Sequence, residues 1–296
     1  IMKRRRIVAF LLALMLILQM TPPATAMAYP APEFGAQDSV AKFENGTPVS
    51  VAHRAAWRSG PENSLLAIAA SIQMGVDVAE LDVKLTSDGV AVLSHDESID
   101  RCTTGSGSIS DYTWEELKGI PLEPEEGGSN TPYVLSEAEA QLLNSLPHYA
   151  EHNGAAAAGG TLPITRLDDA VDLIKQLGPN TMINLDHCFS QERFVACYIL
   201  FRETGMLNQV FFKNSVDSAA MNSWYEAAAA AWNEKHPDSP IDAGEVQRSI
   251  LYVYIIRNAD YSVLQSHLDN GDNLVMVEIC ISDDNMDAQI HDNLEP

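Results

Sequence analysis

The sequence is poor in basic residues, with 18 Lys and Arg against 41 Asp and Glu and a formal charge of −23. Four of the basic residues and none of the acidic ones lie in the first 28 positions, so the remainder carries −27. A chain this acidic repels nucleic acid and anionic membrane surfaces. We therefore expect no nucleic-acid partner, and a small anionic substrate would need local positive charge to bind.

Cysteine is also scarce, with four residues in the chain. No C-x-x-C pair is present, which argues against a structural zinc site. The spacing specifies no disulfide framework, so the disulfide state stays open, and so does the oligomeric state.

Long apolar runs are confined to the N-terminus. Lys3–Arg6 is basic, Ile7–Leu18 is apolar, and small residues follow up to Ala28. This pattern predicts a secretory signal peptide over residues 1–28 and a secreted or extracytoplasmic protein. An uncleaved anchor is the alternative, but the run is shorter than the ~20 residues that a membrane span needs. No later run is long enough, so we expect no stable membrane insertion after signal removal.

Residues 29–48 are rich in Pro, Ala, Gly and polar residues and are typical of a linker. One domain then extends over residues 49–296. Short β-rich runs alternate there with helical segments, and several are continuously apolar, as in parallel strands buried on both faces. The expected strands are 49–55, 76–85, 90–95, 181–186, 209–214, 250–256 and 274–281, and the expected helices 64–74, 113–119, 167–177, 189–204 and 218–232.

This alternation predicts an α/β fold, a barrel of the TIM (β/α)8 type. A closed barrel needs eight strands and seven are expected, so the prediction is a barrel without its last strand–helix unit in this chain. Residues 121–161 are irregular and are interpreted as an insertion, partly helical over 136–146. Asn63 is the expected N-cap of the first helix.

Two carboxylates on the second expected strand indicate a metal site. Glu80 and Asp82 are two apart, so both side chains point to the same face, and the residues around them are apolar. Two buried like charges are costly unless a cation or protons compensate them. The alternative is an edge strand on which both face solvent.

Two histidines come at expected strand ends, His53 after the first strand and His95 after the third. Barrel active sites lie at such ends, where two imidazoles can divide the roles of acid and base. Arg54 offers a fork of donors to a phosphate oxygen, although a salt bridge at the rim is the alternative.

These residues belong to an ordered set of motifs. The sequence contains His53-Arg54-Ala55, then Glu62-Asn63, then Glu80 through Gly89, then His95-Asp96, then Arg101-Cys102-Thr103. In order and spacing this set resembles the glycerophosphodiester phosphodiesterase family, most clearly over residues 49–122.

The resemblance implies a TIM-barrel fold and a phosphoric diester hydrolase. It implies that His53 and His95 are the general acid–base pair, with Glu62 in a supporting role. It also implies a divalent Ca or Mg ion held by Glu80, Asp82 and a later carboxylate, for which Asp186 at the end of the fourth strand is the candidate.

The sequence departs from the family pattern in two places near the site. Ala55 stands where the family has Gly, which matters only if the position needs a positive φ. Cys188 stands where the family has a Lys that faces the phosphate. Lys213, at the end of the fifth strand, is the candidate replacement, with an ordinary surface lysine as the alternative. Glu278 is expected to be structural.

The expected function is metal-dependent hydrolysis of glycerophosphodiesters, or of related phospholipid headgroup diesters, to glycerol 3-phosphate and an alcohol. The partner is a small-molecule phosphodiester. Two alternatives stay open, a catalytically degenerate barrel that binds phospho-ligands, and a sphingomyelinase D-like lyase that forms a cyclic phosphate.

Overall fold

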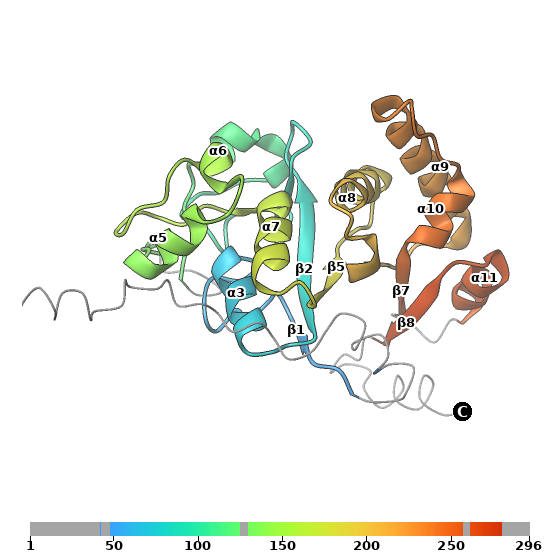
Figure 1. The fold of residues 1–296 in the computed structure, drawn as a ribbon, viewed down its shortest axis with the longest axis horizontal. Coiled ribbons are helices and arrows are strands. Elements are labelled where there is room, and N and C mark those ends of the chain that lie inside the picture. Colours follow the sequence, from blue (N-terminus) through green and yellow to red (C-terminus); the bar gives the residue numbers. More distant parts are fainter. Residues whose placement is uncertain (1–41, 43–47, 125–129, 257–260, 280–296) are drawn as a thin grey trace, which may run out of the picture.

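The structure is a computed structural model that describes residues 42, 48–124, 130–256 and 261–279 (Figure 1). The expected signal peptide and all but two residues of the expected linker lie outside this part of the chain. None of the helices in the described part combines the length and apolarity that crossing a bilayer requires.

Six parallel strands form the main sheet, in the order β1, β2, β5, β6, β7, β8. In Figure 1 the labelled strands run from β1 and β2 near the centre to β7 and β8 on the right, with helices beside and above them. They confirm the α/β barrel type of fold, although the first strand is much shorter than expected. Their bounds are Val51–Ala52, Val78–Leu85, Met182–Asp186, Val210–Asn214, Leu251–Ile256 and Leu274–Ile279.

The two outer strands of this sheet, β1 and β8, are not paired with each other within the described residues. A closed barrel of this type has eight strands in its ring. The outer strands carry Val51 and Val275, which are among the few exposed large apolar side chains. The described sheet is therefore an open arc of a barrel with two edges.

The third expected strand is not part of the parallel sheet. β3 (Ala91–Leu93) pairs antiparallel with the last residues of β2, and β4 (Thr165–Arg166), which we did not expect, pairs antiparallel with β3. The turn before β3 contains Gly89 with φ +80, a backbone conformation that favours glycine. Because this hairpin folds back, the amide of Ser94 donates to the Asp82 carbonyl at 2.8 Å, which returns the chain to the rim of the sheet.

Helices cover the outside of the strands, and those expected from the sequence are present. The helix α3 begins after Ser64, whose hydroxyl accepts from the Ala67 amide, so the expected N-cap at Asn63 was wrong by one residue. The larger of the expected helices are α3 (Leu65–Gln73), α7 (Leu167–Leu177), α8 (Gln191–Glu203) and α9 (Ser218–Lys235). Two further helices were not expected, α10 (Ala243–Ser249) and α11 (Ser262–Asn270).

Between β3 and β4 the chain forms short helices instead of barrel units. They are η1 (Ile109–Asp111), α4 (Trp114–Leu117), α5 (Glu137–Asn144) and α6 (Tyr149–Asn153), and a further short helix, η2 (Leu207–Gln209), precedes β6. Capping boxes begin α4 at Thr113 and α5 at Ser136.

One face of the sheet changes character along the strands. At the strand starts it carries an apolar cluster made by Val78, Met182, Phe211 and Val253. Side chains two residues further along a strand point to the same face. On β2, β5, β6 and β8 the same face becomes polar towards the strand ends, whereas β7 carries the apolar Ile255 there. The polar residues are Glu80, Asn184, Lys213 and Glu278, and then Asp82 and Asp186.

Candidate active site

Three carboxylates meet near the end of the parallel pairing between β2 and β5. Glu80, Asp82 and Asp186 each offer an oxygen, and these oxygens lie within 4.8 Å of one another. The strand register explains the meeting, because Asp82 pairs directly with Asp186. Glu80 is 2% exposed and Asp82 is 1% exposed, which excludes the alternative of a solvent-facing edge. The structure thus brings together the three residues expected to hold a metal.

Burial has a different consequence for each carboxylate. Burial and the nearby Asp82 raise the pKa of Glu80 to about 8. One oxygen of Asp82 accepts from the Asn63 side chain at 2.8 Å, but its Oδ1 is buried without a hydrogen-bond partner. A buried carboxylate oxygen without a partner is costly unless a cation or donor reaches it.

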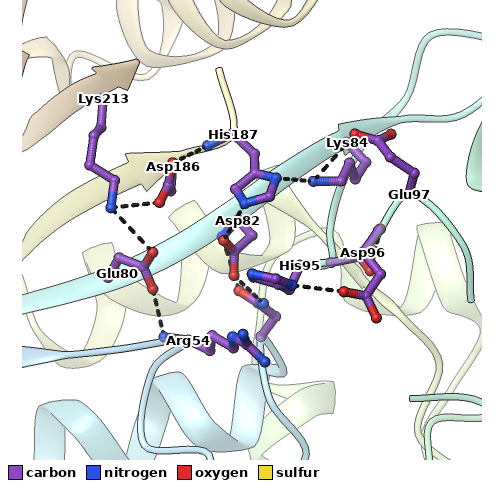
Figure 2. A network of polar contacts seen from close by, with 12 residues as sticks. Arg54, Glu80, Asp82, Lys84, His95, Asp96, Glu97, Asp186, His187 and Lys213 are labelled. Atoms are coloured by element: carbon purple, nitrogen blue, oxygen red, sulfur yellow. Dashed lines mark hydrogen bonds and ion pairs between the residues drawn. The ribbon is translucent and has the colours of Figure 1, made fainter. Parts of the chain in front are cut away.

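The Lys213 ammonium lies among these carboxylates (Figure 2). Its Nζ is 2.6 Å from Asp186, 3.0 Å from Glu278 and 3.6 Å from Glu80. Burial lowers the pKa of Lys213, but Asp186 and Glu80 outweigh it and raise that pKa above its ordinary value. For Asp186, burial raises the pKa, but the charge and hydrogen bond of Lys213 more than offset this and leave the pKa below its ordinary value. Lys213 is therefore a buried part of the site, which excludes an ordinary surface lysine.

The turn after β1 positions one of the carboxylates. The Arg54 amide donates to Glu80 Oε2 at 2.6 Å, and the Ala55 amide donates to the Glu80 carbonyl at 3.0 Å. Arg54 and Ala55 have φ of +52 and +59, so both lie in the left-handed region. The missing glycine therefore matters here, because Ala55 occupies a conformation that glycine adopts without cost.

A chain of ion pairs leads from this turn to His95. Glu62, which is 7% exposed, accepts from the Arg54 guanidinium at 3.0 Å and from both terminal nitrogens of Arg101 at 2.9 and 2.7 Å. Arg101 also donates through Nε to Asp96. Burial raises the pKa of Glu62, but hydrogen bonds and charge from Arg101 and Arg54 hold it below the ordinary value. Glu62 thus supports two arginines, and the sequence motif contained Arg101 without revealing this link.

His95 lies beside Asp82 in Figure 2, and Asp96 holds it from the other side. The His95 Nδ1 and Asp96 Oδ1 atoms are 2.7 Å apart. Burial raises the pKa of Asp96, but Arg101 and His95 together bring it down to about 2. The ionised carboxylate only accepts, so Nδ1 carries a proton, and the neutral form of the ring has its lone pair on Nε2.

His53 is less closely tied to this group. It is exposed in the turn directly after β1. Within the described residues its ring takes no part in the hydrogen bonds and ion pairs that join the other site residues.

Two residues of the site were not assigned a role from the sequence. Lys84 is 1% exposed, and its Nζ is 2.6 Å from Nδ1 of His187, whose Nε2 is 3.5 Å from Asp82 Oδ1. The signal for Lys84 was its spacing, since it follows Asp82 by two residues and therefore shares its face. His187 had no comparable signal, because a left-handed φ of +61 at a strand end orients it. Cys188, at the position of the family lysine, is fully buried.

Three groups of described side chains have a spacing that suits a metal ion. They are Glu80 with Asp82 and Asp186, then Asp82 with His95 and His187, and, away from this site, His152 with Asp168 and Asp169. The first group offers only hard oxygen donors, which suit Ca or Mg. The thiols of Cys102, Cys188 and Cys197 are free, and Cys280 lies outside the described residues.

The fold and the site together define a class, an α/β barrel protein with a buried acidic centre at the carboxyl ends of its parallel strands. Active sites of such barrels lie at these ends. The chain belongs to the glycerophosphoryl diester phosphodiesterase family, whose model matches residues 53–208.

Relatives of known name agree with this assignment. The chain is 41% identical over 93 residues to a glycerophosphodiester phosphodiesterase of Caldanaerobacter subterraneus, covering 30% of this chain and 38% of the relative. It is 42% identical over 100 residues to human glycerophosphodiester phosphodiesterase 1, covering 32% of this chain and 30% of the relative. The matches therefore span less than half the length of these relatives.

A crystal structure of a glycerophosphoryl diester phosphodiesterase from Parabacteroides distasonis has a similar fold. The TM-score is 0.55 at 19% identity, and the match covers 88% of this chain and 76% of the other. This likeness supports the barrel type of fold.

Proposed function

We propose that the protein is a metal-dependent phosphodiesterase that hydrolyses glycerophosphodiesters, or related phospholipid headgroup diesters, to glycerol 3-phosphate and an alcohol. The observation that carries the proposal is the buried carboxylate trio Glu80, Asp82 and Asp186 at the carboxyl ends of neighbouring strands. Family membership and the names of the relatives support the reaction class.

The residues present fit a divalent Ca or Mg ion. The Lys213 ammonium is paired with three carboxylates, those of Glu80, Asp186 and Glu278, and Asp82 lies beside two of them, so the cluster retains excess negative charge with this lysine in place. The partnerless Oδ1 of Asp82 is a ready ligand atom. When bound, such an ion neutralises phosphoryl charge and lowers the pKa of an attacking hydroxyl.

Proton transfer is proposed for His95 and His53. Asp96 fixes the His95 ring, so that its Nε2 lone pair is available to accept a proton from the attacking hydroxyl. His53 is accessible at the adjacent strand end and would serve as its partner, protonating the leaving oxygen.

Arg54 and Lys213 are proposed to bind phosphate oxygens. Glu62 holds the Arg54 guanidinium beside the site, which reduces the entropy lost when substrate binds. Lys213 is already held by Asp186 and Glu278, so its contact with phosphate requires that it exchange one of these partners for the substrate.

The test is release of glycerol 3-phosphate from glycerophosphocholine with added Ca or Mg, then with chelator. We expect turnover that chelation abolishes and re-added metal restores. An Asp82→Asn variant that turns over normally would contradict the proposal, whereas Asp269→Asn, on the exposed face of α11, is the matched control.

Two other outcomes are separated by phosphorus NMR of the same reaction. A lyase would accumulate a cyclic phosphate, and a binding barrel would leave the diester intact. The second alternative is favoured by one observation, namely that the position of the family lysine is the buried Cys188.

Export of the protein is proposed from the sequence alone. A basic start followed by the apolar run Ile7–Leu18 is typical of a secretory signal. Fractionation of cells that produce the full chain, with N-terminal sequencing of the product, tests export and cleavage after Ala28.

A further inference from the structure

The ring of His187 lies over the carboxylate trio and is held from behind by a buried lysine. Figure 2 shows His187 between Asp82 and Lys84. Its Nδ1 is 2.6 Å from Lys84 Nζ, and the ring centroid is 5.0 Å from that of His95. The His187 side chain is 21% exposed, whereas that of Lys84 is 1% exposed. His187 is thus accessible to a ligand at the trio, whereas Lys84, whose Nζ also lies 3.8 Å from Glu97, is buried behind it.

The contact with Lys84 determines where the proton of the imidazole lies. An ammonium group has three donors and no acceptor, so Nδ1 must accept. The ring is then neutral, with its single proton on Nε2.

The Nε2–H group points towards the trio, and within the described part of the chain it makes no hydrogen bond. Asp82 Oδ1 is 3.5 Å away, which is beyond an ordinary N–H···O hydrogen bond. Among the other donors near the trio, Lys213 is engaged by Asp186 and Glu278, and Arg54 by Glu62. The His187 Nε2–H is therefore a donor already aimed at a ligand on the trio.

We propose that His187 is a catalytic residue whose Nε2–H binds a non-bridging phosphoryl oxygen, and that Lys84 is a positioning residue that fixes its tautomer. The proposal rests on the proposed function for the identity of the ligand. It also explains how the site can work with Cys188 in place of the family lysine, because His187, the residue before it, supplies a donor from the same loop.

The rival use of His187 is as a ligand of a metal shared with Asp82 and His95. Metal binding needs the Nε2 lone pair, and hence a proton on Nδ1. The two uses therefore demand opposite tautomers.

The first test is long-range proton–nitrogen NMR of protein labelled with 15N-histidine, at pH 6.5, with His187→Gln to assign the signals. We expect the Nε2–H tautomer alone in the unsubstituted protein and in Lys84→Arg, and a measurable share of the Nδ1–H tautomer in Lys84→Met, where no ammonium faces Nδ1. A proton on Nδ1 in the unsubstituted protein would overturn the proposal. This readout needs no turnover, so an inactive protein would refute the proposed function alone.

The second test compares metal and ligand binding by calorimetry, with MgCl2 alone and then with glycerol 3-phosphate. In His187→Ala we expect unchanged magnesium affinity and about 10- to 100-fold weaker binding of glycerol 3-phosphate, because a hydrogen bond to a charged group is lost. We expect a similar loss in kcat/KM, with partial recovery in His187→Gln, which retains an N–H donor. Weaker magnesium binding, or unchanged glycerol 3-phosphate binding, would overturn the proposal. His148→Gln, at an exposed histidine beside α6, is the control.

Discussion

His95 and His187 lie with their ring centroids 5.0 Å apart, and their Nδ1 atoms contact groups of opposite charge. Asp96 holds Nδ1 of His95, whereas Lys84 holds Nδ1 of His187. A carboxylate and an ammonium impose opposite tautomers, so one ring presents a lone pair and the other an N–H group. One imidazole is therefore prepared to accept a proton and the other to donate a hydrogen bond.

Loss of the carboxylate behind His95 should affect catalysis more than binding. In Asp96→Asn the amide can donate to Nδ1, which moves the His95 proton to Nε2 and removes the base. We expect kcat to fall by about 100-fold or more with little change in KM. Steady-state kinetics on glycerophosphocholine measures both. Asp100→Asn is the control, because Asp100 is exposed and four residues further on. An equal fall in both variants would argue against this role.

Metal binding should release a proton. Burial and Asp82 raise the pKa of Glu80 to about 8, so at neutral pH the metal-free site holds a proton that a cation must displace. We expect magnesium affinity to rise with pH up to about 8 and then level off. Calorimetry in buffers of different ionisation enthalpy measures the protons released. A pH-independent affinity, with no proton release, would show that Glu80 is already ionised.

The same shift predicts how the metal-free fold responds to pH. The pKa of Glu80 is higher in the folded than in the unfolded protein, so its contribution to stability is full below the ordinary value of 4.5 and is lost as pH rises through about 8. We expect the metal-free melting temperature to fall over this range and magnesium to restore it at pH 8. Glu80→Gln should flatten this dependence.

The turn at Ala55 should discriminate sharply between side chains. Ala55→Gly stabilises the fold by relieving a left-handed φ. It destabilises the fold by removing a buried methyl group and by raising the entropy of the unfolded chain. Because these effects oppose one another, we expect the free energy of unfolding to change by no more than about 1 kcal/mol. Ala55→Val places a β-branched residue in this conformation and should cost about 3 kcal/mol. Urea unfolding measures both. A tolerated valine would mean that the turn relaxes, and magnesium affinity should then fall because the Glu80 carboxylate loses the Arg54 amide that holds it.

A buried polar network should hold the last helices to the sheet. Asp272 accepts from His267 at 2.6 Å, Tyr225 at 3.0 Å and Gln247 at 2.9 Å, and these residues come from α11, α9 and α10. Asp272→Ala leaves several buried donors without an acceptor and should destabilise the protein by about 3 kcal/mol. Thermal unfolding measures this, with the exposed Asp269→Ala as control. Equal melting temperatures would show that water replaces the carboxylate.

Features that repeat locally could be predicted from the amino-acid sequence. Period-two spacing put Glu80 and Asp82 on one face, continuous apolar runs indicated strands buried on both sides, and the amphipathic pattern over 167–177 matched α7 at both ends. These features depend on neighbours along the chain, which the sequence displays directly. The motif order was likewise sufficient to indicate the family.

Which side chains share the site depends on how distant segments pack together. The antiparallel direction of β3, the pairing of Asp82 with Asp186, the ion pairs of Lys213 and the entry of His187 all depend on contacts between distant segments. A charged side chain takes its partner from whatever the fold brings within a few ångströms, and desolvation then sets its pKa. Spacing along a strand specifies the face on which a residue lies, but register and burial specify what it meets there.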